Sequence, residues 1–180
     1  MRVITGSARG RKLVSPDGYE VRPTLDKVKE GLFSAIQFEI EGRSCLDLFA
    51  GSGQLGIEAL SRGAADCVFV DNSKKSLQAI NANIAACGFA QQAKVVSGDA
   101  LSYMRSCMQT FGIVFLDPPY GQKMIDRVLP YVADHMTDGG IIVCECDLDE
   151  VLPQTVGAFE IDRERRYSHT RVTIYRRKQV

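Results

Sequence analysis

The segment Asp117-Pro118-Pro119-Tyr120 joins a carboxylate, a stiff turn and an aromatic ring directly after an apolar run at 113–116. The run is typical of a buried parallel strand, and the prolines end it because proline has no N–H for a sheet ladder. In open α/β sheets, ligands bind at the carboxyl ends of the strands. Asp117 and the Pro118 carbonyl can accept hydrogen bonds from a planar amine, and Tyr120 can stack on the ring that bears it. A rigid strand exit without a ligand is the alternative interpretation.

A glycine motif lies upstream of this segment. Gly51, Gly53 and Gly56 form G-x-G-x-x-G between a strand-like run at 45–49 and a helix-like run at 54–62. Glycine permits a tight turn, close approach of the backbone to a ligand and close packing of the following helix. The motif alone is weak, and a tight turn without a ligand would also explain it. Its position between a strand and a helix favours a bound nucleoside cofactor.

Two further carboxylates end the next two strand-like runs. Asp71 follows the glycines by 20 residues, a spacing that suits hydrogen bonds from both hydroxyls of a ribose. Asp99 ends the third run and could accept from an adenine amine, with Ala100 against the ring. The alternative for both is an N-cap of the helix that follows, a role that Asn72 or Ser73 could take instead of Asp71.

Nicotinamide dinucleotides and S-adenosylmethionine both fit this arrangement. A dinucleotide site needs free helix N–H groups for a pyrophosphate, whereas Asp47 puts a carboxylate near the glycine loop, which suits an amino-acid ammonium. Neither histidine is an obvious hydride-site residue: His135 is expected near a helix C-terminus and His169 at a hairpin tip. We therefore expect S-adenosylmethionine and methyl transfer to an exocyclic amine. Asp117 and the Pro118 carbonyl would free the nitrogen lone pair from ring conjugation, and no metal is required.

The elements that must position these residues alternate along the chain. Strand-like runs are predicted at 45–49, 67–71, 94–97, 112–117 and 140–146, and helix-like runs at 24–38, 54–62, 74–86, 100–108, 122–136 and, briefly, 148–154. Repeated βα units predict a parallel sheet covered on both faces. Residues 159–167 and 170–177 predict an antiparallel pair that closes this sheet, and residues 2–14 predict a small N-terminal hairpin.

Composition limits the function classes. The chain has 180 residues, 45% of them hydrophobic and 24% charged, as expected of one globular domain. No apolar stretch is long enough to span a membrane and the N-terminus lacks a signal-peptide core, so we expect a cytoplasmic protein without a membrane partner. The six cysteines lie in apolar runs and are expected to be free and buried. Cys144 and Cys146 lack the further ligands of a zinc site, so no metal is predicted.

Charge is concentrated at the two ends. The net charge is zero, but residues 1–30 carry +3, residues 161–180 carry +5 and the stretch between them carries −8. This asymmetry favours a polyanionic partner such as a nucleic acid. Two solvated basic hairpins are the alternative.

These motifs resemble those of the RsmD family of class I S-adenosylmethionine-dependent methyltransferases. The similarity rests on segments 6–13, 22–33 and 47–64 and on Asp117-Pro118-Pro119-Tyr120, in the family's order along nearly the whole chain. Lys29, where arginine is common, and Gln54, at a variable position, are small departures. The resemblance implies transfer of a methyl group to the N2 amine of a guanine in 16S rRNA during small-subunit assembly. An N6-adenine methyltransferase acting on DNA or RNA is the alternative, because the motif does not separate guanine from adenine.

We expect a single domain, with residues 1–40 as an N-terminal hairpin and helix and residues 41–180 as a cofactor-binding core with a Rossmann-like, seven-stranded, mostly parallel sheet. The expected partner is 16S rRNA, in the small subunit or an assembly intermediate, bound by a monomer. The expected catalytic residues are Asp117, Pro118, Pro119 and Tyr120. The expected cofactor contacts are Arg22, Pro23, Thr24, Asp47, Phe49, Ala50, Gly51, Ser52, Gly53, Gly56, Asp71, Asn72, Ser73, Asp99 and Ala100, the first three implied by the resemblance alone. The expected RNA contacts are Arg9, Arg11, Lys12, Arg165, Arg166, His169 and Arg171.

Overall fold

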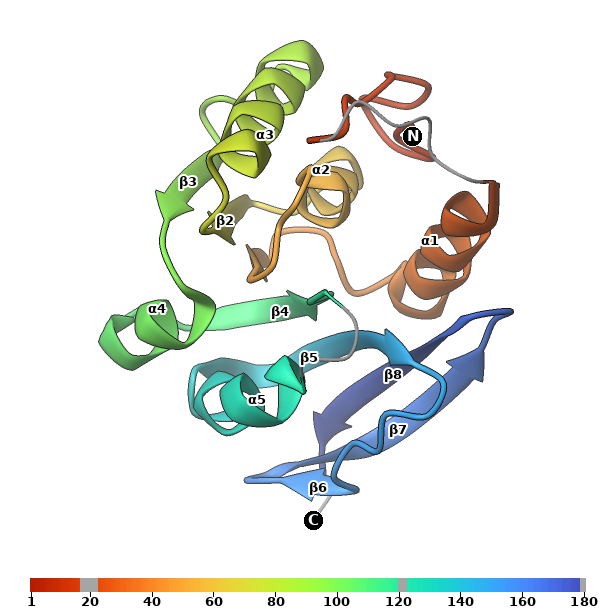
Figure 1. The fold of residues 1–180 in the computed structure, drawn as a ribbon, viewed down its shortest axis with the longest axis vertical. Helices are drawn as coiled ribbons and strands as arrows, with labels where there is room; N and C mark the ends of the chain where they lie inside the picture. Colours follow the sequence, from red (N-terminus) through yellow and green to blue (C-terminus); the bar gives the residue numbers. More distant parts are fainter. Residues whose placement is uncertain (17–22, 120–122, 179–180) are drawn as a thin grey trace.

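A computed structural model describes residues 1–16, 23–119 and 123–178. Its centre is one eight-stranded sheet in the order β3-β2-β1-β4-β5-β8-β7-β6 (Figure 1). The strands are β1 Ser44–Asp47, β2 Asp66–Asp71, β3 Ala93–Ser97, β4 Phe111–Leu116, β5 Met136–Asp147, β6 Thr155–Val156, β7 Phe159–Arg166 and β8 Thr170–Arg177. Strands β1 to β5 pair in parallel, and β8, β7 and β6 continue the sheet with antiparallel pairing.

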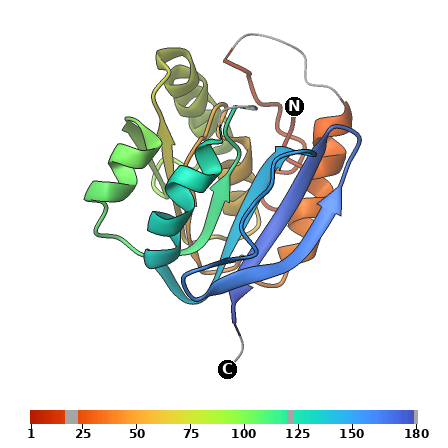
Figure 2. The ribbon, with the colours of Figure 1, turned by 60° about the horizontal axis from the view of Figure 1, so that its bottom comes forward.

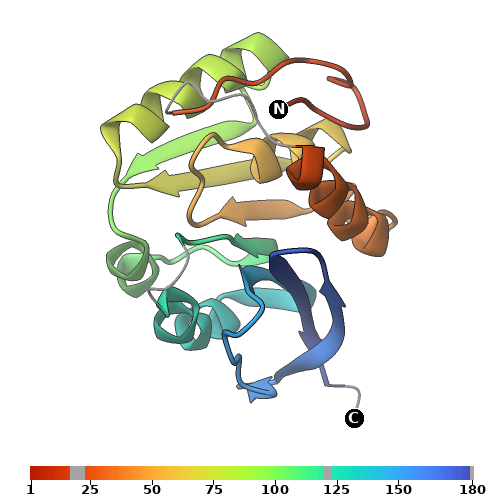
Figure 3. The ribbon, with the colours of Figure 1, turned by 45° about the vertical axis from the view of Figure 1, so that its right-hand side comes forward.

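In the described part of the chain, five helices cover the two faces of the sheet. They are α1 Pro23–Ile36, α2 Gln54–Ser61, α3 Lys74–Cys87, α4 Ala100–Ser106 and α5 Met124–Asp134. Apolar side chains of α1, α2 and α3 share one core with one face of the strands, and those of α4 and α5 share a second core with the other face. The arrowheads of β1, β2 and β3 point to one edge of the sheet (Figure 3). The carboxyl ends of the parallel strands therefore meet there, as the predicted alternation requires.

The antiparallel pair β7–β8 lies beside α1 (Figure 2). A Cβ added to Gly31 of α1 would lie 2.0 Å from the Tyr167 hydroxyl oxygen, so the absent side chain lets the helix approach the hairpin. Asp147 at the end of β5 pairs with Thr170 at the start of β8. The turn at 167–169 consequently lies at the same sheet edge as the ends of the parallel strands.

One predicted element is absent from the structure. Residues 148–154 form a turn and irregular backbone, not a helix, and the two-residue strand β6 follows, giving eight strands where seven were expected. The N-terminal hairpin is present but short: one antiparallel bridge joins Arg2 to Lys12, and the N–H groups of Val3 and Leu13 donate to the carbonyls of Arg11 and Met1. Beyond it, the N–H groups of Ile4 and Thr5 donate to the Glu58 carboxylate at 2.8 and 3.0 Å.

The described residues contain no helix long and apolar enough to cross a membrane. In the same part of the chain, His, Cys, Asp and Glu side chains form no group of three or more that could hold a metal ion. The six cysteines are free, four of them buried.

Candidate active site

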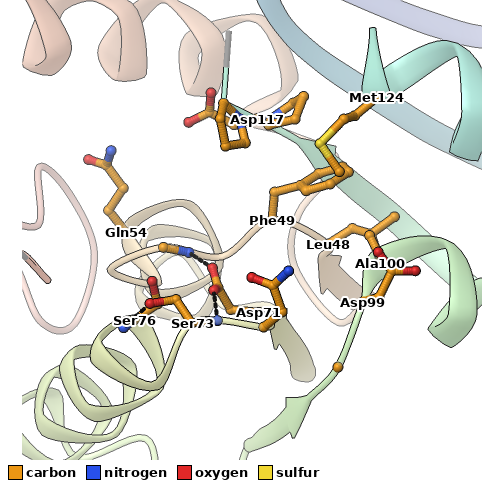
Figure 4. Close-up of a pocket in the computed structure, with 15 residues that line it drawn as sticks. Leu48, Phe49, Gln54, Asp71, Ser73, Ser76, Asp99, Ala100, Asp117 and Met124 are labelled. Atoms are coloured by element: carbon orange, nitrogen blue, oxygen red, sulfur yellow. Dashed lines mark hydrogen bonds between the residues drawn. The ribbon is translucent and has the colours of Figure 1, made fainter. Parts of the chain in front are cut away.

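A cavity of about 620 Å³ opens at the carboxyl ends of β1, β2, β3 and β4 (Figure 4). Each of these strands ends in a short loop that leads toward a helix, so four loops supply its walls. The residues that line it are Leu48, Phe49, Gly51, Gln54, Asp71, Asn72, Ser73, Ser76, Gly98, Asp99, Ala100, Asp117, Pro118, Pro119 and Met124. The structure thus brings the predicted strand-end carboxylates Asp71, Asp99 and Asp117 to one cavity.

The glycine motif shapes the wall between β1 and α2. Gly51 and Gly53 have φ values of 57° and 77°, a left-handed conformation that favours glycine. A Cβ on Gly56 would lie 2.4 Å from Cε1 of Phe69 and 2.7 Å from Sγ of Cys67, so this glycine lets α2 pack closely on β2. Gly51 lines the cavity, whereas Gly53 and Gly56 act beneath it by setting the turn and the helix position.

Asp71 is fixed by two backbone donors. The Gly51 N–H donates to its Oδ2 and the Ser73 N–H donates to its Oδ1, each at 2.8 Å (Figure 4). Each oxygen keeps acceptor capacity, so the carboxylate is held in one orientation and can still accept from two adjacent hydroxyls. The N-cap of α3 is Ser73, which leaves Asp71 to face the cavity.

Asp99 is the N-cap of α4. Its Oδ1 accepts from the backbone N–H of Ser102 at 2.9 Å and from the Ser102 hydroxyl at 3.0 Å, and these bonds hold the pKa of Asp99 below its ordinary value. The capping alternative is therefore correct, and it is compatible with the other role because both bonds from Ser102 go to Oδ1. Ala100 is buried against the same wall of the cavity.

Asp117 lies just beyond the end of β4 and lines the cavity with Pro118 and Pro119. Burial raises its pKa well above the ordinary value, and the charges of Glu145 and Asp47 raise it further. Glu145 of β5 follows Cys144, which pairs with Leu116 of β4, so Asp117 and Glu145 are neighbours on adjacent strands. Tyr120, the last predicted catalytic residue, lies outside the described residues.

Five predicted cofactor residues are turned away from the cavity or lie behind its wall. Asp47 is 1% exposed, and its Oδ2 accepts the Gly56 N–H at 3.0 Å, so it ties the strand to α2. Ala50 is buried. The Ser52 hydroxyl contacts the sulfur of Met1, and its carbonyl accepts from Asn83. The other two are Gly53, which precedes α2, and Gly56, which packs against β2. Arg22 lies outside the described residues, and Pro23 and Thr24 begin α1.

Sequence reasoning missed five residues of the cavity wall, namely Leu48, Gln54, Ser76, Gly98 and Met124. Gln54, Ser76 and Met124 belong to the first turns of α2, α3 and α5. In a parallel α/β sheet these turns face the carboxyl ends of the strands. The signal that could have found them is thus their position directly after each predicted strand end.

The predicted RNA contacts divide into exposed and buried residues. Arg9, Arg11 and Lys12 are exposed on the N-terminal segment, and Arg165, Arg166 and His169 are exposed on β7 and its turn. Arg171 is only 8% exposed: its guanidinium donates to the Glu150 carbonyl and faces Glu164, so it holds the 147–150 turn from below. His169 lines a second hollow of about 350 Å³ at the same sheet edge, with Lys123 and the residues 147–150.

Replacing Asp47 by asparagine is expected to raise the free energy of unfolding above about pH 7 and leave it unchanged below about pH 4. Burial raises the pKa of Asp47 from 3.8 to about 7, so between these values the folded chain keeps a proton that the unfolded chain has lost. The wild type therefore loses stability as pH rises through this interval. At about 1.4 kcal/mol per pKa unit, the variant gains up to about 4 kcal/mol at high pH.

Chemical denaturation at about pH 4 and pH 8 measures this difference. Asparagine keeps an oxygen for the Gly56 N–H, so the change tests the charge and not the hydrogen bond. An equal gain at both pH values would show that Asp47 does not titrate in this interval.

Comparisons with known proteins give one consistent result. A family model described as "Conserved hypothetical protein 95" matches residues 1–176. The chain is 40% identical to "Putative rRNA methyltransferase YlbH" of Bacillus subtilis, aligned over 99% of this chain and 100% of the relative. It is 34% identical to "Ribosomal RNA small subunit methyltransferase D" of Escherichia coli, over 99% of this chain and 90% of the relative. The solved structure of yhhF from Escherichia coli superposes with a TM-score of 0.86 at 32% identity, covering 100% of this chain and 99% of that chain.

Proposed function

Because the chain belongs to the RsmD family, whose model is described as "Conserved hypothetical protein 95", we propose that it is an S-adenosylmethionine-dependent methyltransferase acting on the N2 amine of a guanine in 16S rRNA. The fold agrees, because the sheet is that of a class I methyltransferase, mostly parallel with an antiparallel C-terminal pair. The observation that carries the proposal is the meeting of Asp71, Asp99 and Asp117 at one cavity between the glycine loop and the Pro118-Pro119 turn.

The cavity residues fit the proposed cofactor. A volume of about 620 Å³ suits a ligand of nucleoside size. Asp71 would hold the ribose hydroxyls, Asp99 and Ala100 the adenine, and the glycine loop the amino-acid end. The Gln54 Oε1 is shielded from solvent and has no hydrogen-bond partner among the described residues, which indicates a polar ligand on that wall. When bound, S-adenosylmethionine supplies a methyl group activated by its positively charged sulfur.

The residues around Asp117 prepare the amine. The Asp117 carboxylate and the Pro118 carbonyl each accept a hydrogen bond from one N–H of the amine. These two bonds turn the nitrogen lone pair out of conjugation with the ring. The prolines hold this carbonyl in place, so positioning supplies much of the rate. As the nitrogen gains a carbon it must release a proton, and a carboxylate whose pKa is raised by burial is suited to accept it. Stacking of Tyr120 on the base completes the proposed arrangement.

Exposed arginine and lysine side chains at the two ends of the chain would bind the RNA. Arg9, Arg11, Lys12, Arg165 and Arg166 are exposed, so they are open to phosphate contacts, which position the nucleic acid while the cavity selects the base. Arg171 is not included, because its guanidinium is buried under the 147–150 turn. Binding should therefore weaken as salt is raised. We expect a monomer acting in the cytoplasm.

Methyl transfer to small ribosomal subunits, followed by nucleoside analysis, tests the proposal. Radiolabelled S-adenosylmethionine is incubated with subunits from cells that lack the activity, with naked 16S rRNA and with duplex DNA. Label is expected on N2-methylguanosine from rRNA. Label on N6-methyladenosine, or on DNA alone, would replace the guanine assignment by the adenine alternative. The comparison of subunits with naked rRNA shows which of them the enzyme accepts.

A further inference from the structure

Gln54 stands on a part of the cavity wall that the proposed adenine and ribose contacts do not use. It is the first residue of α2, directly after Gly53, whose left-handed backbone starts the helix. Figure 4 places its side chain on the opposite side of Asp71 from Asp99 and Ala100, and it lines the cavity as Asp117 does. Along the cavity the order is therefore Asp99, Asp71, Gln54.

The amide oxygen of Gln54 lacks a hydrogen-bond partner. Its Oε1 is shielded from solvent, and no donor among the described residues reaches it. Buried polar atoms are nearly always hydrogen-bonded, because an unpaired one loses its contact with water without replacement. An oxygen left in this state on the wall of a cavity is best explained by a donor that arrives with the ligand.

The order of contacts identifies that donor. With adenine at Asp99 and ribose at Asp71, the remaining part of S-adenosylmethionine is its amino-acid end, which carries an ammonium and a carboxylate. An amide oxygen accepts from the ammonium and cannot donate to the carboxylate. Asp47, the acceptor expected from the sequence, is 1% exposed and already accepts the Gly56 N–H. Gln54 is the acceptor that the structure presents to the cavity in its place.

We propose that the Oε1 of Gln54 binds the α-ammonium group of the methyl donor, as a specificity residue for the amino-acid end. This inference rests on the proposed function. The Gln54 Nε2 can at the same time donate to the neighbouring carboxylate, so one amide would distinguish the complete amino-acid end from a truncated one.

Calorimetric binding of three ligands to the wild type and to Gln54→Met tests the proposal without turnover. The ligands are S-adenosylhomocysteine, its analogue without the α-amino group, and 5′-methylthioadenosine, which lacks the whole amino-acid end. Methionine keeps the length and helix propensity of glutamine but offers no amide. Gln54→Met should weaken S-adenosylhomocysteine binding by about tenfold or more, the usual effect of losing a hydrogen bond to a charged group. The affinity of Gln54→Met for 5′-methylthioadenosine should stay within about twofold of the wild-type value, because this ligand has no amino-acid end to contact Gln54.

The analogue without the amino group assigns the contact to the ammonium. The wild type should bind it as weakly as Gln54→Met binds S-adenosylhomocysteine, and the substitution should add little further loss. A further full loss with this analogue would overturn the ammonium assignment, as would equal losses with all three ligands or none. The same substitution at Gln78, exposed on α3, is the control and should leave all three affinities unchanged. If the wild type bound none of the three ligands, the proposed function itself would fail. If the wild type binds them, the differences in affinity between the wild type and Gln54→Met test the role of Gln54 alone.

Discussion

Replacing Asp117 by alanine is expected to lower kcat for methyl transfer by about 10²- to 10³-fold, the range typical of losing one positioned catalytic hydrogen-bond partner. Asp117 lies at the end of β4 and faces the cavity, so alanine removes an acceptor for the amine without moving the prolines. Binding of S-adenosylhomocysteine should persist, because Asp71 and Asp99 are on other strands. Single-turnover kinetics on the rRNA substrate and calorimetry separate the two effects.

Asparagine at position 117 distinguishes two roles for the carboxyl group. If Asp117 only accepts a hydrogen bond from the amine, Asp117→Asn should retain much more activity than Asp117→Ala, because the amide oxygen can still accept. If Asp117 also takes the proton, both variants should be equally slow. Asp138→Ala removes a carboxylate that is 96% exposed at the opposite end of β5 and should leave kcat unchanged. Full activity of Asp117→Ala would remove the residue from the mechanism.

The pH profile gives an independent check on Asp117. Burial and the neighbouring Glu145 and Asp47 raise its pKa, so the wild type should gain activity as pH rises through a range above that of an ordinary carboxyl group. Activity should rise and not fall with pH because only the ionised carboxylate can both accept the amine's hydrogen bond as a charged group and take up its proton. Asp117→Asn does not titrate and should lose this rise.

The strand–helix alternation was predictable because each element carries a local signal. Apolar runs such as 113–116 correspond to strands buried on both faces, and all five predicted parallel strands lie within one or two residues of the observed ones, except that β5 starts four residues earlier, at Met136. The stretch 148–154 was predicted wrongly as a helix. It contains Pro153 and is held by the Arg171 guanidinium and by the Tyr175 hydroxyl, which donates to the Pro153 carbonyl at 2.7 Å. These tertiary contacts come from β8, distant in the sequence, and leave no periodic pattern.

The site was predictable where a residue follows a strand directly and less so where its side-chain direction mattered. Asp71, Asp99 and Asp117 face the cavity as expected. Asp47 ends β1 in the same way, but its side chain lies on the face that packs under α2, where it meets the Gly56 N–H. Whether the last side chain of a strand points to the cavity or under a helix depends on which helix covers that face of the sheet. The neighbouring residues in the sequence do not determine which helix this is.

Replacing Glu58 by alanine is expected to destabilise the fold by about 3 to 5 kcal/mol, the usual result of removing one partner of a buried ion pair. Glu58 is fully buried, with its carboxylate 2.8 Å from Arg62 Nε and 3.6 Å from Lys29 Nζ. It also accepts the N–H groups of Ile4 and Thr5. Alanine would leave two cations without their carboxylate and two N–H groups without an acceptor. Thermal unfolding should show a midpoint about 10 °C lower, as such a change implies for a chain of this length.

The same variant shows whether Glu58 anchors the N-terminal segment to α2. Amide exchange at Ile4 and Thr5 should accelerate far more than exchange in β4, because their acceptor is gone while the sheet is intact. Glu58→Gln keeps an acceptor oxygen and loses only the charge, so it should fall between alanine and the wild type and remain measurable if alanine does not fold. Glu160→Ala, at an exposed position of β7, is the matched control and should change the midpoint little. A Glu58→Ala midpoint equal to that of Glu160→Ala would contradict the role of the buried carboxylate. Since the anchored segment leads toward the predicted cofactor contacts at 22–24, its release should also weaken S-adenosylhomocysteine binding.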